Sequence, residues 1–265
     1  MIKNTDSSET FYLLNEKDQK IPLVFVHGVG LTHEIWKPQI DYFKNYTTLS
    51  YDILGHGKTP LNKTNINFND FSEQLIKLID ELNFQKIHLI GFSIGSLIAR
   101  NFATKHNDRL QSLILLGSIY KRSEEQQRIV NDRFNLAKKN HTLSKQALKR
   151  WFTDKYLEKN PDIYEKISSI LEKNNIENFL KVYELFVFHK NKEKFENIKV
   201  KTLVMTGEND AGSTTEMSKN LSNIIKNSQF KLIKDGKHLC GIECADDVSM
   251  AIKNFIESND QTKRI

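Results

Sequence analysis

One serine in this chain lies in a setting that favours nucleophilic chemistry. The pentapeptide Gly91-Phe92-Ser93-Ile94-Gly95 follows the apolar run of residues 87–90 and precedes a stretch with helical spacing of apolar side chains. A G-x-S-x-G pattern between a buried strand and a helix is typical of a sharp turn that exposes the serine hydroxyl at the end of a sheet. Glycines on both sides of the serine suit such a turn, because they leave room for the backbone. A turn of small residues without chemistry is the alternative.

A serine hydroxyl needs a neighbouring base that takes its proton as it attacks, and the pKa of histidine suits that role. Among eight histidines, His238 alone follows the last predicted strand, in a loop that returns to the same end of the sheet. Asp210 lies in the loop after the strand predicted at residues 200–206 and would orient the imidazole; Glu208 is the alternative acid. The chain order serine, acid, histidine is a known order for such triads. We therefore predict that Ser93, Asp210 and His238 are catalytic.

Attack on a carbonyl carbon creates an oxyanion, which requires two preorganised hydrogen-bond donors. The backbone N–H of Ile94, directly after Ser93, is one candidate. The segment His27-Gly28-Val29-Gly30 would supply the second, and the N–H of Val29 is our choice, because the glycines let this backbone approach closely. A phosphate-binding loop is the competing interpretation, but the segment is too short and lacks the Lys-Ser/Thr of that motif. Val29 and Ile94 are thus the predicted oxyanion hole.

A wound α/β sheet would bring these residues together, because chemistry in such sheets lies at the carboxyl ends of the strands. Apolar strand-like runs alternate along the chain with helical patterns, as expected for a mostly parallel sheet flanked by helices. Asp70 with Glu73 and Ser213 with Glu216 resemble capping boxes and predict helix starts. The predicted strands cover residues 21–26, 47–52, 86–90, 110–116, 200–206 and 229–233, with an antiparallel edge strand at 10–14, and the predicted helices cover 70–82, 94–106, 217–225 and 246–258.

Residues 121–195 interrupt this alternation, because they contain helical patterns and no convincing strand. Such an insertion between two strands would lie over the strand ends as a cap above the serine. We therefore predict a core domain formed by residues 1–120 and 196–265, and a helical cap (lid) formed by residues 121–195. Most aromatic side chains of the insertion would form its own core, and a minority would line the pocket.

The charge of the chain is concentrated in the same insertion. The 265 residues have a formal net charge of +6, and residues 121–195 hold 17 Lys and Arg against 11 Asp and Glu, whereas the remainder holds 22 of each sign. A solvated helical surface explains this excess, and a preference for an anionic substrate is the sharper alternative. No nucleic-acid-binding module accompanies the charge, so we expect no nucleic-acid partner.

Other features set the expected compartment and cofactors. No run approaches the ~20 apolar residues of a membrane span, and residues 1–10 lack the apolar core of a signal peptide. Two cysteines, Cys240 and Cys244, supply neither a disulfide framework nor a zinc site. We expect a cytoplasmic protein with no membrane partner, no metal and no cofactor, and the oligomeric state stays open.

Four segments in this order resemble the α/β-hydrolase superfamily: residues 25–30 (FVHGVG), residues 51–59 (YDILGHGKT), the pentapeptide around Ser93, and residues 207–214. The resemblance spans nearly the whole chain. It implies the α/β-hydrolase fold, a mostly parallel sheet flanked by helices with a helical cap after its sixth strand, and the same triad and oxyanion donors. It also implies that Asp52 and the glycines after it shape a loop near the site.

Within the superfamily, the chain is most similar to 3-oxoadipate enol-lactonase-like hydrolases, through Arg150-Trp151-Phe152-Thr153 and residues 207–214. The lactonases often carry arginine at the position of Leu54 and glycine at that of Ser96, so the chain departs from them there. The similarity implies a small anionic lactone as substrate and makes Arg150 and Trp151 candidate substrate-binding residues.

These observations predict a cofactor-independent serine hydrolase of the EC 3.1.1 type. It would cleave a small carboxylic ester or lactone through an acyl-enzyme on Ser93. The alternatives are a general short-chain carboxylesterase, a thioesterase, an amidase or a perhydrolase with the same three residues. Two alternatives of a different class are a non-catalytic ligand-binding protein of the same fold and a partner-binding role for the cap.

Overall fold

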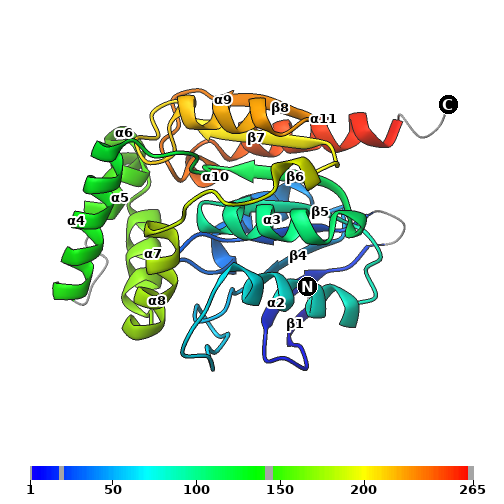
Figure 1. Cartoon of the computed structure of the whole chain (residues 1–265), viewed down its shortest axis with the longest axis horizontal. Helices are drawn as coiled ribbons and strands as arrows, with labels where there is room; N and C mark the ends of the chain where they lie inside the picture. The colour runs from blue at the N-terminus through cyan, green and yellow to red at the C-terminus, as the bar shows by residue number, and fades with distance from the viewer. Residues whose placement is uncertain (1, 18–20, 141–145, 262–265) are drawn as a thin grey trace.

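The computed structural model describes residues 2–17, 21–140 and 146–261. They contain an eight-stranded sheet in the order β1-β2-β4-β3-β5-β6-β7-β8 (Figure 1). β2 is antiparallel to both of its neighbours, β1 and β4, and all other neighbours are parallel. The strands are β1 (Ile2–Thr5), β2 (Phe11–Asn15), β3 (Leu23–Val26), β4 (Thr48–Tyr51), β5 (Ile87–Phe92), β6 (Leu110–Leu116), β7 (Thr202–Gly207) and β8 (Ser228–Ile233).

Helices cover both faces of this sheet, and each central strand divides its side chains between two hydrophobic cores. In β3, Val24 and Val26 belong to one core, whereas Leu23 and Phe25 belong to the other. The first core includes side chains of α2 (Phe68–Glu81), α3 (Ile94–Lys105) and α9 (Thr215–Ile224), and the second includes side chains of α1 (Lys37–Tyr42), α10 (Cys240–Glu243) and α11 (Ala245–Gln261). Short 3-10 helices span η1 (His33–Trp36), η2 (Asn107–Arg109) and η3 (Phe195–Asn197). Burial on both faces explains why the central strands read as continuous apolar runs.

The α/β-hydrolase fold predicted from the sequence is confirmed, with differences at the element ends. β2 fulfils the prediction of an antiparallel strand, but the edge position belongs to β1, whose short polar sequence gave no strand signal. Helix α2 begins two residues before Asp70, because Asn67 is its N-cap and Asp70 closes the capping box from the third helical position. Thr214, not Ser213, caps α9 by accepting from the Met217 N–H.

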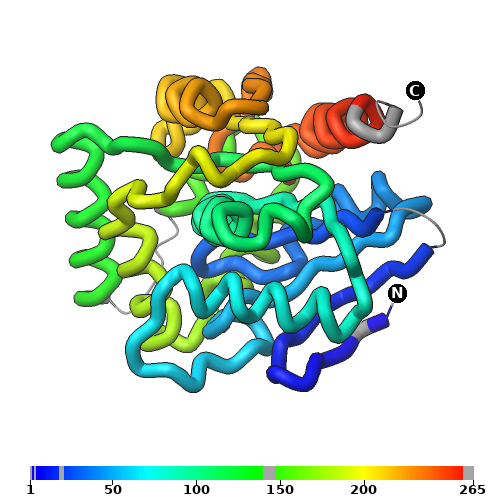
Figure 2. The backbone as a smooth tube through the Cα atoms, turned by 45° about the vertical axis from the view of Figure 1, so that its right-hand side comes forward, coloured from blue at the N-terminus to red at the C-terminus, as the bar shows by residue number. Residues whose placement is uncertain are grey.

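Between β6 and β7 the described residues form helices joined by loops and contain no strand. In Figures 1 and 2 these helices form a group at one end of the sheet. They extend both cores: Val130 and Phe179 join the first, and Leu148 and Ile167 join the second. The helices are α4 (Glu124–Asn140), α5 (Gln146–Trp151), α6 (Asp154–Lys159), α7 (Pro161–Glu172) and α8 (Ile176–Val187).

A buried arginine of α3 binds both connections between this helical insertion and the sheet. Arg100 is 0% exposed, and its Nη1 donates to the carbonyl oxygen of Ile119 at 2.8 Å, on the entry side. On the exit side, Nη2 lies 2.6 Å from Oε1 of Glu193, which also lies 3.1 Å from Nε2 of His189. Burial lowers the pKa of the Arg100 guanidinium, and the Glu193 charge opposes that shift. The guanidinium therefore depends on this carboxylate for compensation of its charge.

Replacing Glu193 by glutamine should lower the free energy of unfolding by about 3 kcal/mol, because loss of one partner leaves a buried charge uncompensated. Urea unfolding of Glu193→Gln against wild type measures this. The matched control is Glu125→Gln, which breaks the exposed Arg128–Glu125 pair at 2.7 Å and should cost less than about 1 kcal/mol. Equal effects of the two substitutions would contradict the prediction.

Candidate active site

Ser93 lies in a strained turn between β5 and α3, with φ 55° and ψ −120°. The flanking glycines make this turn possible. A Cβ on Gly91 would lie 2.3 Å from the carbonyl oxygen of Gly95, and one on Gly95 would lie 2.4 Å from the carbonyl oxygen of Val26. The Ser93 N–H donates to the Leu116 carbonyl at 3.0 Å, which ties the turn to β6. A non-glycine residue in such a conformation is held there by its surroundings, and such strain is common at functional sites.

The structure brings the three predicted catalytic side chains together. The hydroxyl of Ser93 lies 3.2 Å from Nε2 of His238, and Nδ1 of His238 lies 2.6 Å from Oδ2 of Asp210. The other oxygen of Asp210 accepts from the backbone N–H groups of Gly212 and Ser213, at 2.8 and 2.9 Å. The alternative acid, Glu208, is exposed and accepts from the N–H of Asp235. This chain of hydrogen bonds can pass a proton from the hydroxyl to the imidazole and stabilise the resulting imidazolium.

The segment after β3 approaches the serine closely. A Cβ added to Gly28 would lie 3.3 Å from the Cβ of Ser93 and 3.0 Å from the ring of Phe92. Neither the N–H of Val29 nor that of Ile94 donates a hydrogen bond within the part of the chain that the structure describes. Val29 and Ser93 both line the same cavity. The two predicted oxyanion donors are thus backbone groups at the serine with no intramolecular acceptor among the described residues.

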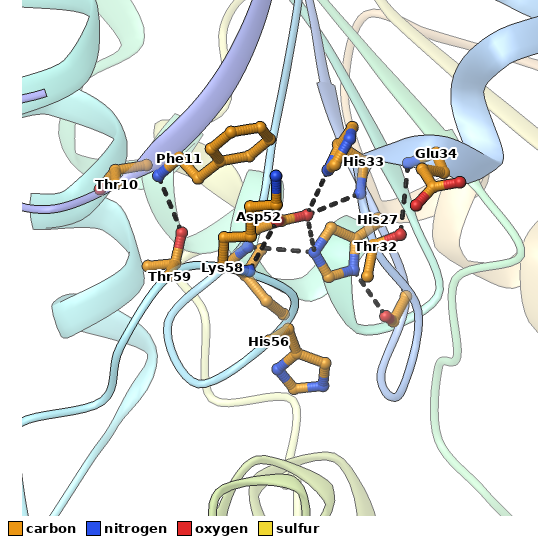
Figure 3. Close-up of polar contacts among 12 residues, drawn as sticks. Thr10, Phe11, His27, Thr32, His33, Glu34, Asp52, His56, Lys58 and Thr59 are labelled. Atoms are coloured by element: carbon orange, nitrogen blue, oxygen red, sulfur yellow. Dashed lines mark hydrogen bonds and ion pairs between the residues drawn. The ribbon is translucent and has the colours of Figure 1, made fainter. Parts of the chain in front are cut away.

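Buried histidines lie around Asp52, on the segments that follow β3 and β4 (Figure 3). Oδ1 of Asp52 accepts from the N–H of His33 at 2.8 Å and lies 2.7 Å from Nδ1 of the same residue. Oδ2 accepts from the N–H of Lys58 at 3.0 Å. A Cβ on Gly57, where φ is +56°, would collide with this carboxylate at 2.1 Å. Asp52 thereby joins the loops after β3 and β4, in the structural role that the resemblance implies.

The pKa values of this cluster follow from its burial. Desolvation lowers the pKa of His27 to about 4 and that of His56 to about 3. Burial would raise the pKa of the Asp52 carboxyl, but the hydrogen bond from His33 and the nearby imidazoles lower it below its usual value. At neutral pH the cluster therefore holds two neutral imidazoles beside an ionised carboxylate.

A cavity of about 210 Å³ opens above Ser93, between the strand ends and the helical insertion. Its lining includes the three predicted catalytic side chains and the two predicted substrate-binding residues, Arg150 and Trp151. The insertion contributes further lining residues that were not predicted, because a single side chain gives no signal in the sequence of where it points. They are Arg122, Gln126, Ile129, Val130, Arg133, Tyr183 and Phe186. A groove of about 440 Å³ between β8 and α11 contains none of the predicted residues.

The insertion gives this cavity a positive character. Arg122 is anchored by the carbonyl oxygens of Phe186 and Val187, at 3.2 and 2.9 Å, and burial lowers its pKa to about 10. Burial also lowers the pKa of Arg150, and the charge of Arg133 acts in the same direction. All three guanidiniums are close enough to Tyr183 to lower its pKa, against a larger increase from burial. The guanidiniums are therefore near one another in a partly desolvated space.

The described ranges hold no group of three or more His, Cys, Asp or Glu side chains arranged for a metal ion. Within the same ranges, none of the helices combines the length and apolar character required to traverse a bilayer.

Comparisons with known proteins agree with this fold. Residues 21–127 match the family model described as the alpha/beta hydrolase fold. The chain is 29% identical over 249 residues to (E)-2-((N-methylformamido)methylene)succinate hydrolase of Acinetobacter baylyi, covering 92% of this chain and 93% of the relative. It is 25% identical over 268 residues to 3-oxoadipate enol-lactonase 1 of the same organism, covering 97% of each. The enol-lactonase crystal structure from Burkholderia xenovorans LB400 superposes with a TM-score of 0.83 at 21% identity, covering 97% of this chain and 100% of that one.

The resemblance to α/β hydrolases and to enol-lactonases is thereby confirmed, and the relatives support hydrolase activity. The roles of the individual site residues stay predictions, as do the ester class of the substrate and the cytoplasmic location.

The free energy of unfolding should fall as the pH is lowered from about 6.5, the ordinary histidine pKa, to about 4, the native pKa of His27. In this range both His27 and His56 bind protons in the unfolded chain but stay neutral in the native protein, where burial lowers their pKa. Each unit of pKa difference between the two states is worth about 1.4 kcal/mol of stability. Above pH 6.5 both histidines are neutral in either state and do not reduce the free energy of unfolding. Acidification below that pH progressively lowers it. Urea unfolding across this range measures it, and His56→Gln should flatten the slope. Stability that is constant or rises on acidification would refute this expectation.

Proposed function

Taking the α/β-hydrolase fold as our premise, we propose that this protein is a serine hydrolase that cleaves a small, anionic carboxylic ester or lactone. The observation that carries the proposal is the hydrogen-bonded chain from Ser93 through His238 to Asp210, at 3.2 and 2.6 Å. It stands at the floor of the cavity beside two backbone N–H groups with no acceptor among the described residues.

The proposed mechanism needs no cofactor. Ser93 Oγ attacks the carbonyl carbon while its proton moves to Nε2 of His238, and the carbonyl oxygen becomes an oxyanion held by the N–H groups of Val29 and Ile94. Asp210 accepts from Nδ1–H, which keeps Nε2 available as the base. His238 then gives the proton to the leaving alkoxide or enolate. Water attacks the acyl-serine in the same way and releases the acid.

The arginines of the insertion support an anionic substrate. Arg122, Arg133 and Arg150 line the cavity, and a bound carboxylate would offset the mutual repulsion of charges in a partly desolvated site. Two relatives bear names with the carboxylates succinate and oxoadipate, which agrees with such a substrate. A carboxylate on these side chains would place the ester or lactone carbonyl toward Ser93.

We further propose that residues 121–195 act as the cap of a core formed by residues 1–120 and 196–265. In support, helices α4, α5 and α8 each contribute lining residues to the cavity above Ser93. Trp151 packs toward the proposed base, with its ring centroid 6.4 Å from that of His238. Such a cover would exclude water and select the substrate by size and charge.

Ser93→Ala should lower kcat for p-nitrophenyl acetate by at least about 10⁴-fold, since the nucleophile is lost, and should leave the thermal unfolding transition unchanged. The wild type, and not this variant, should be labelled by a fluorophosphonate probe. A control is Ser7→Ala, which changes an exposed serine outside the cavity lining. Hydrolysis undiminished in Ser93→Ala would show that Ser93 is not the nucleophile. A wild type that binds esters without turning them over would favour a ligand-binding protein instead.

Arg150→Ala should raise KM for monomethyl succinate about tenfold, a loss of about 1.4 kcal/mol, and leave KM for dimethyl succinate within about twofold of wild type. The anionic and neutral esters differ by one carboxylate, so the comparison isolates its recognition. Arg128→Ala serves as the matched control, because Arg128 is exposed on α4 and outside the cavity lining. Proton release in a pH-stat measures both esters. Equal changes in KM for the two would remove the argument for an anionic substrate.

A further inference from the structure

We infer that His56 is a positioning residue for the oxyanion donor at Val29, and that it works as one half of a clamp whose other half is His27. The inference rests on the function proposed above. His56 is 1% exposed and is absent from the residues lining the cavity, so it would act through the backbone and not by touching substrate.

The two imidazoles hold the two peptide units on either side of Val29. A peptide unit is planar and rigid, so fixing its carbonyl also fixes the direction of its N–H. The carbonyl oxygen of Gly28 lies 2.8 Å from Nδ1 of His27 and also accepts from the N–H of Leu31 at 3.2 Å. The N–H of the same peptide unit is that of Val29. In the next unit, the N–H of Gly30 donates to Nε2 of His56 at 2.8 Å.

The loop that carries His56 is itself well fixed. The backbone N–H of His56 donates to the carbonyl oxygen of Ile53 at 3.0 Å. The carbonyl oxygen of His56 accepts from the N–H of Thr59, also at 3.0 Å. Its Nδ1 lies 3.3 Å from the carbonyl oxygen of Leu54. The ring also packs against that of His27, with centroids 5.6 Å apart. A side chain held at its backbone and at both ring nitrogens can fix the position of its partner, Gly30.

This clamp requires a particular tautomer of each ring. His56 must be unprotonated at Nε2 to accept from Gly30, and its proton then lies on Nδ1, facing Leu54. His27 likewise donates through Nδ1 to Gly28, and its Nε2 accepts from the N–H of Ile53 at 3.0 Å. The titratable groups around the pair are Asp52 and His33, with Asp52 Oδ1 4.0 Å from Nε2 of His27. Burial opposes protonation of either ring, which protects both acceptors at neutral pH.

A clamp on this backbone matters because an oxyanion donor is effective only when it is aimed at the developing charge before the reaction begins. A displacement of about 1 Å in a reacting geometry can cost on the order of 100-fold in rate. Loss of the His56 acceptor would free the Val29–Gly30 peptide unit to rotate. It would therefore reduce stabilisation of the transition state and leave ground-state binding largely intact.

The test compares His56→Met with His56→Gln, two side chains of equal length of which only glutamine offers a strong acceptor near the position of Nε2. His56→Met should lower kcat for p-nitrophenyl acetate on the order of 100-fold with KM within about twofold, and His56→Gln should restore most of that loss. His106→Met, at the end of α3, controls for the loss of an imidazole elsewhere. If His56→Met keeps the wild-type kcat, or His56→Gln falls as far, the inference is wrong.

A second readout separates positioning from stability. Trifluoroacetone would add to Ser93 Oγ as the serine proton moves to His238, and its carbonyl oxygen would become an oxyanion in the proposed hole. Its inhibition constant should rise in His56→Met by about the same factor as kcat/KM falls. An inhibition constant unchanged in a variant with a lowered melting temperature would show a purely structural role and overturn the inference.

The wild type supplies a test that does not depend on a folded variant. In ¹⁵N NMR spectra of the imidazoles, Nε2 of His56 should have the shift of an unprotonated nitrogen from pH 5 to pH 8 and should couple to the amide nitrogen of Gly30. A protonated Nε2 would refute the clamp. A wild type that shows this coupling but neither hydrolyses esters nor reacts with the fluorophosphonate probe would instead refute the proposed function.

Discussion

The turn at Ser93 is the constraint on which the rest of the site depends. Its positive φ exists only because Gly91 and Gly95 let β5 and α3 meet at distances that no Cβ permits. The same contact brings the backbone of Gly95 against the end of β3, at the carbonyl oxygens of Val26 and His27. The residues after β3 are thereby placed beside the serine. This close packing of backbone on backbone thus fixes both Ser93, the predicted nucleophile, and the segment predicted to hold the oxyanion.

The buried groups of Asp52, His27 and His56 each keep a single protonation state at neutral pH. A buried carboxylate needs partners, and Asp52 obtains them from the N–H groups of His33 and Lys58 and from the His33 ring. Two neighbouring rings, His27 and His56, stay neutral because burial opposes their protonation. Neutral imidazole differs from an ammonium or a carboxylate, since it can both donate and accept at fixed positions. That property lets these two rings hold a backbone carbonyl and a backbone N–H group without adding a charge of their own beside the proposed oxyanion hole.

Much of this site could be predicted from the sequence, because its signals are local. The glycines around Ser93 follow from the turn itself, and the apolar runs of β5, β6 and β7 show which loops meet at the carboxyl ends. Contacts between distant segments that no local pattern indicates could not be predicted. In the sequence, nothing distinguishes Arg122 from the many other basic residues of the insertion. Its place in the cavity follows from its hydrogen bonds to carbonyl oxygens of α8. His56 is likewise a loop residue in the sequence, and only the path of the backbone brings it to Gly30.

The insertion and the sheet are coupled at the segment that matters for the proposed chemistry. Asn174, after α7, donates to the carbonyl oxygen of Gly30 at 2.8 Å, so the peptide unit after the His56 contact is held from the side of the helices. Arg100 holds the entry and exit of the same insertion. A displacement of the helices would therefore act on the backbone next to Val29 as well as on the arginines of the cavity. The proposed substrate contacts and the proposed oxyanion donor are thus joined to the same helical insertion, through Asn174 and Arg100.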